Sequence, residues 1–176
     1  TREGALCEPL SVGIHACRRG NVGVGDTVLV TGAGPIGLLA VEAARAAGAT
    51  DVLVTDVVAE KLAFAEEGGV DRAIDVTEED LATVVDEYTN GVGADVVIEA
   101  SGAEPSIQST LDGVRRGGTV VFVGLASEAE VPLDVLEIID DELDVHGSFR
   151  YANTYDAAVD LLADGEVDVA IGRAHV

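Results

Sequence analysis

The feature that most constrains the fold is the segment of residues 28–37, in which three β-prone residues run directly into a G-x-G-x-x-G motif. An alanine- and leucine-rich segment follows at once, and this strand–turn–helix context is the one in which the motif binds dinucleotides. Gly32 would permit the tight turn, Gly34 would let the backbone approach a pyrophosphate, and Gly37 would let the helix pack close to the strand. The pyrophosphate would lie at the helix N-terminus, where N–H groups and the helix dipole favour an anion. Pro35 suits the first turn of that helix, since its missing N–H would have no intrahelical partner there.

The residues after the motif favour a dinucleotide site over an ordinary turn between a strand and a helix. Residues 35–47 are apolar almost all round, as suits a helix that lies on a sheet. A second strand at residues 51–55 ends at Asp56, at about the 20-residue offset expected for the acid that binds the adenine ribose. A carboxylate accepts hydrogen bonds from the free diol of NAD but repels the 2′-phosphate of NADP, so Asp56 predicts NAD. Lys61, five residues on, could reach the same ribose, although a single helix lysine is more often merely solvated.

Strand and helix signals alternate along the rest of the chain. Strand signals lie at residues 28–30, 51–55, 72–75, 95–99, 119–123 and 143–149, and helix signals at residues 9–19, 35–47, 59–67, 78–88, 105–115, 134–140 and 154–163. The central strands are continuous apolar runs, which is typical of parallel strands covered on both faces. We therefore predict an α/β fold with six strands: a doubly wound parallel sheet in the order 3-2-1-4-5-6, forming one dinucleotide-binding domain over residues 1–176.

The composition excludes several classes of partner. There are 33 acidic and 10 basic residues, a net charge of −23, so the surface would repel nucleic acid and anionic membranes. The acids are spread through the helical segments, which favours adaptation to a salt-rich cytosol, where ions screen the repulsion. No apolar run is long enough to span a membrane and no signal peptide is evident, so we expect a cytoplasmic protein. Cys7 and Cys17 have no zinc-ligand spacing, and we expect both to be small buried residues.

No complete catalytic set is visible in the residues themselves. The three histidines, His15, His146 and His175, are scattered, and His15 lies in an apolar stripe where a packed core histidine is expected. Glu8 would lie just before a helix that begins at Pro9, a position at which the helix dipole favours an acid. The chain therefore contains a cofactor-binding module without the machinery for hydride transfer.

Six segments together resemble a known family. They are GALCEPLSVGIHACRRG, VLVTGAGPIGLLAVEAARAAGA, VLVTD, SGAEPSIQ, GGTVVFVGL and SFRYANTY. In combination they closely resemble polyol dehydrogenases of the sorbitol and xylitol type, which belong to the zinc-dependent medium-chain dehydrogenases. The resemblance runs nearly end to end, and its first and last segments are much more specific than the glycine motif.

The resemblance implies that a separate N-terminal domain, absent from this chain, supplies a cysteine, a histidine and a glutamate around a catalytic zinc. That zinc would act as a Lewis acid on the alcohol oxygen, so that hydride can leave to the nicotinamide. Glu8 matches the residue at the fourth zinc position, usually through a water that the substrate contacts, and no direct metal ligand is expected here. Arg150 and Tyr151 match the substrate-contacting pair. The positions that match cofactor contacts are Ile36, Asp56, Lys61, Val123, Gly124, Leu125, Ser148, Phe149 and Arg150.

Two alternatives stay open beside a polyol dehydrogenase. One is a relative acting on threonine, butanediol or an aldose, although the residues around Arg150 and Tyr151 favour a polyol. The other is a module that only senses NAD(H) to regulate a partner. A bare sensor would have no use for the segments around Glu8 and Arg150. We expect these 176 residues to bind NAD but not to turn over a polyol by themselves, and expect a homodimer or homotetramer with the sixth strand at a dimer contact.

Overall fold

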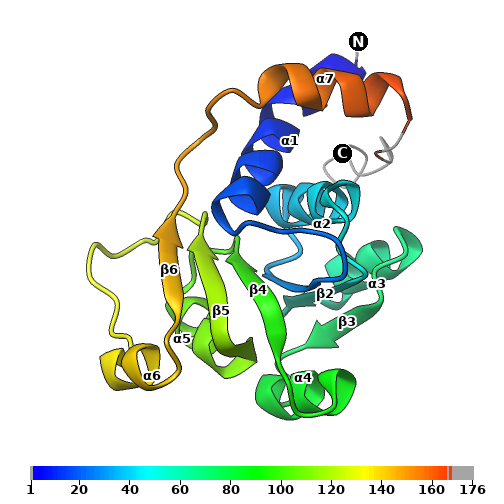
Figure 1. Cartoon of the computed structure of the whole chain (residues 1–176). Helices are drawn as coiled ribbons and strands as arrows, with labels where there is room; N and C mark the ends of the chain where they lie inside the picture. The colour runs from blue at the N-terminus through cyan, green and yellow to red at the C-terminus, as the bar shows by residue number, and fades with distance from the viewer. Residues whose placement is uncertain (1, 166, 168–176) are drawn as a thin grey trace.

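Six parallel strands form the sheet of the computed structural model, which describes residues 2–165 and residue 167. The strand order is β3-β2-β1-β4-β5-β6, as predicted, and it reverses between β1 and β4 (Figure 1). The strands are β1 Thr27–Thr31, β2 Asp51–Asp56, β3 Arg72–Asp75, β4 Ala94–Glu99, β5 Val114–Phe122 and β6 Asp144–Gly147. The helices are α1 Arg2–Arg19, α2 Pro35–Ala47, α3 Ala59–Glu67, α4 Leu81–Thr89, α5 Glu104–Gly113, α6 Val135–Asp140 and α7 Tyr155–Ala163. None of the helices in the described part of the chain is long and apolar enough to cross a membrane.

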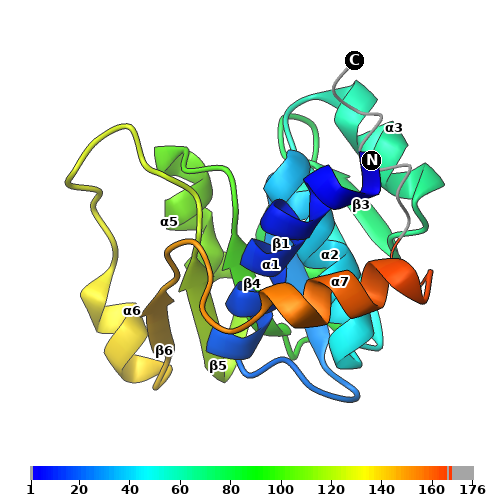
Figure 2. The ribbon, with the colours of Figure 1, turned by 90° about the horizontal axis from the view of Figure 1, so that it is seen from above.

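Alternate residues of each strand enter two separate cores. In β1, Val28 and Val30 belong to the core under α1, α2, α3 and α7, whereas Leu29 belongs to the core under α4 and α5. The two views of the ribbon show these helices in two layers, one on each face of the sheet (Figures 1 and 2). Because both faces are covered, the central strands are apolar at nearly every position, which is the pattern seen in the sequence.

The register of the strands brings their carboxyl ends to one edge of the sheet. Thr31 of β1 pairs with Thr55 of β2 and with Glu99 of β4. Glu99 in turn pairs with Phe122 of β5, and Phe122 pairs with Gly147 of β6. The turns that follow these strands therefore lie together, at the edge where ligands bind in doubly wound sheets.

The first helix is longer than predicted. It begins at Arg2 and carries Pro9 in its interior, whereas the sequence predicted a start at Pro9. The proline removes one main-chain hydrogen bond, but packing against α2 holds the helix: Leu10 is fully buried, and a Cβ on Gly13 would lie 2.8 Å from the Leu39 carbonyl oxygen. Glu8 therefore lies inside the helix. The prediction that it precedes the helix, at a position where the helix dipole favours an acid, was wrong.

The boundary between α5 and β5 also differs from the prediction. The helix ends at Gly113 and the strand begins at Val114, although a helix was predicted as far as Arg115. Val114 pairs with Ala94, and Arg115 forms an ion pair with Asp95 at 2.6 Å between Nε and Oδ1. These contacts lie between strands that are distant in sequence, so local propensity does not indicate them.

Candidate functional site

The glycine turn after β1 has the conformation and the spacing that the motif predicted. Gly32 has φ +103°, and a Cβ there would lie 2.9 Å from the Ser101 Cβ. A Cβ on Gly37 would overlap the carbonyl oxygen of Gly32, so glycine is needed for α2 to approach the turn. Gly34 is the N-cap of α2, and a Cβ there would meet nothing within 4 Å among the described residues.

The open space over Gly34 suits the pyrophosphate of a dinucleotide. In the first turn of α2, Ile36 and Gly37 present N–H groups that have no partner within the helix. No side chain of the turn fills the space, and the positive end of the α2 dipole faces it. The residues present therefore fit the diphosphate of a dinucleotide.

Asp56 lies at the end of β2 with its carboxylate directed at this turn. Its Oδ2 accepts a hydrogen bond from the Ala33 N–H at 2.9 Å, and its Oδ1 accepts from the N–H groups of Val57 at 2.8 Å and Val58 at 3.0 Å. The Nζ of Lys61 is 3.4 Å from Oδ2, on a side chain that is about half exposed. Main-chain donors from two turns thus hold the carboxylate beside the glycine turn, with the lysine at its outer side.

The turns after β4 and β5 are packed into each other through glycines. A Cβ on Gly102, where φ is +73°, would overlap the Leu125 carbonyl oxygen, and a Cβ on Gly124 would overlap the Gly102 nitrogen. Gly124 is thus required by packing within the chain, in addition to the cofactor contact that its position suggested. Val123 is half-buried and donates its N–H to the Glu99 carbonyl, while Leu125 is exposed.

The segment after β6 is held by the C-terminal end of α1. Arg19 donates from Nε to the Gly147 carbonyl at 3.2 Å, and Arg18 donates from Nη1 to the Asn153 carbonyl at 2.8 Å. Within this segment the Arg150 residue has φ +53°, and its guanidinium lies 5.4 Å from the centre of the exposed Phe149 ring.

Two further residues of this segment were predicted to contact ligands. Ser148 donates its N–H to the Phe122 carbonyl at 2.8 Å, and its hydroxyl oxygen is buried with no hydrogen-bond partner in the described part of the chain. Tyr151 packs its ring 6.2 Å from that of Tyr155. The predicted cofactor residues therefore come from the ends of four strands, β1, β2, β5 and β6, and from the start of α3, and they gather along the same edge of the sheet.

Glu8 does not join this group. It lies on the exposed side of α1, and within residues 2–165 no hydrogen bond or ion pair links it to another candidate residue. The described residues also contain no group of three or more histidine, cysteine, aspartate or glutamate side chains that could hold a metal ion. A zinc ion therefore does not fit the described residues alone.

The histidines and cysteines occupy separate places. His15 is half-buried on α1, and burial together with the nearby Arg19 and Arg18 lowers its pKa. His146 is half-buried on β6, while His175 lies outside the described residues. Both cysteines are buried as predicted, and burial raises the pKa of the Cys17 thiol to about 12.

From the sequence, Glu99 was predicted only as the last residue of a strand, with no role at the site. Its side chain is fully buried at the edge where the candidate residues gather. The signal that could have found it is an acid that closes an apolar strand, immediately before the Ser101-Gly102 turn.

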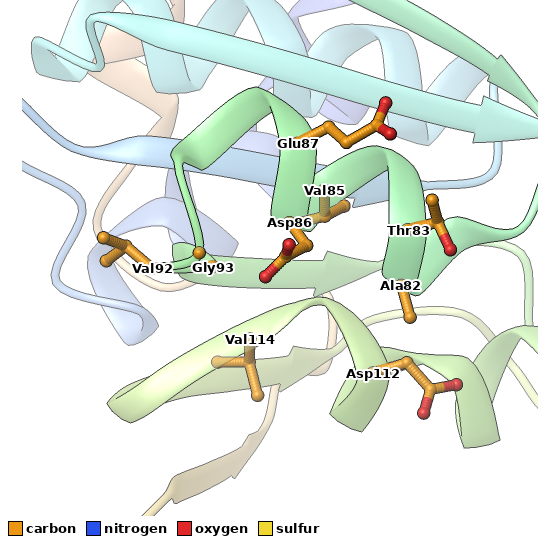
Figure 3. Close-up of a pocket in the computed structure, with 10 residues that line it drawn as sticks. Ala82, Thr83, Val85, Asp86, Glu87, Val92, Gly93, Asp112 and Val114 are labelled. Carbon is orange, nitrogen blue, oxygen red and sulfur yellow. The ribbon is translucent and has the colours of Figure 1, made fainter.

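A hollow of about 500 Å³ lies on the opposite face of the sheet from α1 and α2, between α4 and the end of α5. Asp86 of α4 and Asp112 of α5 lie on its two sides (Figure 3). None of the predicted candidate residues lines it, and its acids would repel the phosphates of a nucleotide. The turns at the carboxyl edge of the sheet are therefore the better candidate for the cofactor site.

Comparison with known proteins identifies a family model and several relatives that this chain matches. Residues 35–164 match the family model described as zinc-binding dehydrogenase. Sorbitol dehydrogenase of Bacillus subtilis strain 168 is 45% identical over 166 residues, which cover 94% of this chain and 47% of that protein.

Two solved structures are similar in fold. The 2R,3R-butanediol dehydrogenase of Bacillus subtilis superposes with a TM-score of 0.88 at 31% identity, covering 95% of this chain and 48% of that one. A structure from Sinorhizobium meliloti 1021, described as a zinc-binding dehydrogenase bound to NADP, superposes with a TM-score of 0.87 at 35% identity. The match covers 94% of this chain and 49% of that one. The chain thus spans about half the length of the relatives that it matches. The family model covers well over half of the chain, and the chain belongs to the zinc-binding dehydrogenase family.

Proposed function

We propose that this chain is the cofactor-binding part of an NAD-linked, zinc-dependent dehydrogenase that moves a hydride between a polyol or other secondary alcohol and NAD. The observation that carries the proposal is the Asp56 carboxylate, held 2.9 Å from the Ala33 N–H beside the glycine turn. From there it can accept hydrogen bonds from both hydroxyls of an adenine ribose. A 2′-phosphate would bring two like charges into contact, so we expect NAD to be preferred.

In this proposal the residues of the chain bind and orient the cofactor. The first turn of α2 would hold the diphosphate, and Asp56 with Lys61 would hold the ribose beyond it. The turns after β4, β5 and β6 would hold the nicotinamide half, with Val123, Gly124 and Ser148 among the contacts. Zinc, when bound in the whole enzyme, would supply a Lewis acid for the alcohol oxygen. Its other ligands would come from outside the described residues, and Glu8 would act at its fourth position, directly or through a water.

Asp56→Ala tests the cofactor assignment. We expect NAD affinity to fall by about 10- to 100-fold, because a hydrogen bond to a charged group contributes about 1.5–3 kcal/mol. NADP affinity should fall less or rise, so the preference for NAD narrows. Titration calorimetry with both nucleotides on the full chain measures this, and Glu60→Ala, which removes an exposed acid from α3, is the control. Tighter binding of NADP than of NAD by the wild type would contradict the proposal.

The substrate is proposed to be a polyol such as sorbitol or xylitol. Arg150 and Tyr151 support this, since a guanidinium and a phenol can hydrogen-bond to several hydroxyls of one ligand. The fold similarity to a butanediol dehydrogenase favours a shorter diol as the second candidate. Initial rates of the whole enzyme with sorbitol, xylitol, 2,3-butanediol and threonine would decide between them. Turnover of a polyol by these 176 residues alone would contradict the need for further zinc ligands.

We also propose that the protein forms a homodimer or homotetramer through β6. This strand is an edge of the sheet, and Val145 on it is partly exposed. Helix α6 lies beside β6 (Figure 1), and its residues Val135, Leu136 and Ile139 are each more than half exposed. β6 pairs with β5 on one side only, and its open edge beside apolar side chains suits pairing with a second copy. Light scattering of the whole protein would give the subunit number.

The setting of the protein is proposed to be a salt-rich cytoplasm. The net charge of −23 supports a halophilic protein, since dissolved ions would screen the repulsion between its acids. Two buried cysteine thiols and the proposed use of NAD suit a reducing compartment.

A further inference from the structure

Glu99 is a completely buried acid at the centre of the carboxyl edge of the sheet. It ends β4 and pairs with Thr31 of β1 on one side and Phe122 of β5 on the other. The strand order reverses between β1 and β4, which is where a doubly wound sheet opens the crevice for a dinucleotide. Glutamate is almost never fully buried unless it is paired, and burying it costs free energy. Its contacts therefore indicate what it does.

One oxygen of Glu99 holds the turn that follows β4. Its Oε1 accepts hydrogen bonds from the Ser101 N–H at 2.9 Å, the Ser101 hydroxyl at 2.7 Å and the Gly102 N–H at 2.9 Å. The Ser106 hydroxyl of α5 lies 3.0 Å from the same oxygen and 2.9 Å from Thr31 Oγ1. A single atom thus connects the ends of β1 and β4 with the first turn of α5.

The other oxygen lies against the turn after β5. Glu99 Oε2 is buried without a hydrogen-bond partner in the described part of the chain, and a Cβ on Gly124 would lie 2.5 Å from it. A buried acceptor without a partner costs about 1–3 kcal/mol, so this atom does not stabilise the fold. The main-chain carbonyl of Glu99 accepts hydrogen bonds from the N–H groups of Val123 at 2.8 Å and Gly124 at 3.0 Å.

The position of the Ser101-Gly102 turn matters to both of its neighbours. Ser101 packs on Gly32 of the glycine motif, and the Gly102 nitrogen is in tight contact with Gly124. A small movement of this turn would displace the turn after β5. The glycine turn after β1 is held separately, because Gly32 donates its N–H to the Thr55 carbonyl at 2.8 Å and Ala33 donates its N–H to Asp56 Oδ2 at 2.9 Å. Glu99 is the side chain that prevents such a movement.

We propose that Glu99 is a positioning residue for the nicotinamide half of the bound dinucleotide, an inference that rests on the proposed function. Each half of a doubly wound sheet binds one mononucleotide. Asp56 and the glycine turn belong to the half formed by β1, β2 and β3, so the nicotinamide half falls to the turns after β4 and β5. Glu99 sets the separation of these two turns without touching the cofactor itself.

The test compares two ligands on the full chain: NAD, and ADP-ribose, which lacks the nicotinamide. Glu99→Gln keeps the size of the side chain and one acceptor oxygen for Ser101 and Gly102, but it removes the negative charge that strengthens these hydrogen bonds. We expect NAD to bind roughly tenfold more weakly, the loss expected from one weakened hydrogen bond. ADP-ribose affinity should stay within about twofold, because its contacts lie in the other half of the sheet. Titration calorimetry measures both values.

Glu104→Gln is the matched control, since it is the same substitution at an exposed position in the first turn of α5. Ser106→Ala removes one of the four donors to Oε1 and should weaken NAD selectively by a smaller factor. It decides the question if Glu99→Gln does not fold. Equal affinity losses for NAD and ADP-ribose, or no loss for either, would overturn the inference. If the wild type binds neither NAD nor ADP-ribose, the proposed function itself is contradicted.

Discussion

Gly34 and Gly37 lie in the same turn but are glycine for different reasons. A Cβ on Gly34 would point into space that no described residue occupies, whereas a Cβ on Gly37 would overlap the Gly32 carbonyl oxygen. Gly34 also has φ −76° and ψ −179°, which any residue adopts. The fold therefore needs the second glycine, and the first is free to serve a ligand.

This difference predicts opposite effects for two alanine substitutions. Gly34→Ala should leave the free energy of unfolding within about 0.5 kcal/mol, because a slightly poorer N-cap is offset by a stiffer unfolded chain. Its NAD affinity should fall by at least about tenfold, because the methyl group occupies the space for the pyrophosphate. Gly37→Ala should cost about 2–3 kcal/mol of stability from overpacking. Urea unfolding measures the stability of both variants, and titration calorimetry measures their affinity for NAD. Unchanged NAD binding by Gly34→Ala would show that the pyrophosphate lies elsewhere.

Helices α4, α5 and α6 bring acids together on one face of the sheet. Asp80 caps α4 by accepting the Thr83 N–H at 2.9 Å, and its charge faces Asp112 of α5. Burial, and then the charge of Asp80, raise the pKa of Asp112. Burial, followed by the charges of Asp112, Asp134 and Asp141, also raises the pKa of Glu137 on α6. The packing of these helices therefore includes a repulsive component at neutral pH.

Asp112→Asn should relieve this repulsion. Because the folded-state pKa of Asp112 is raised, its contribution favours folding below the ordinary carboxyl pKa of about 4 and is lost as the pH rises through the folded-state value. The variant should therefore be more stable than the wild type at pH 7 in low salt, and the difference should disappear near pH 3. Urea unfolding at the two pH values measures this. Glu87→Gln, at an exposed acid on α4, is the control. An equal gain in stability in this variant would show that the lower net charge alone, and not the repulsion between Asp80 and Asp112, causes the effect.

The whole molecule carries 33 acidic residues against 10 basic ones. Among the described residues, five ion pairs join an acidic side chain to a basic one. Several of these side chains are more than a third exposed, so solvent weakens the pairs. Most acids therefore face other acids through solvent. Self-repulsion of this kind opposes the compact state. The stability of the whole molecule should therefore depend on the surrounding salt more than that of a neutral protein does.

We expect the melting temperature to rise between low and molar KCl, because the Debye length falls to about 3 Å at 1 M salt. Calorimetric melting in a KCl series measures the change. Sucrose at matched osmolality is the control, since it promotes burial without screening charge. A melting temperature that stays constant or falls in KCl would count against adaptation to high salt.

Residues that are near in sequence account for what could be predicted. The bounds of α2 and α3 and the whole of β3 were predicted to the residue, since glycine, proline and apolar periodicity mark them locally. The strand order also followed from the alternation of apolar strands and helices. The start of α1 was missed because Pro9 is a local signal that packing against α2 overrides.

The sequence by itself determined the doubly wound sheet, the glycine turn and the acid at the end of β2, because each depends on residue types at short, regular spacings. Only the tertiary structure decided that Ser101 of the turn after β4 packs on Gly32, that Gly124 is needed to pack against Gly102, and that Arg18 and Arg19 hold the segment after β6. These contacts join segments up to 135 residues apart. They exist only once the register of the strands has brought their carboxyl ends to a common edge, and no local pattern encodes that register.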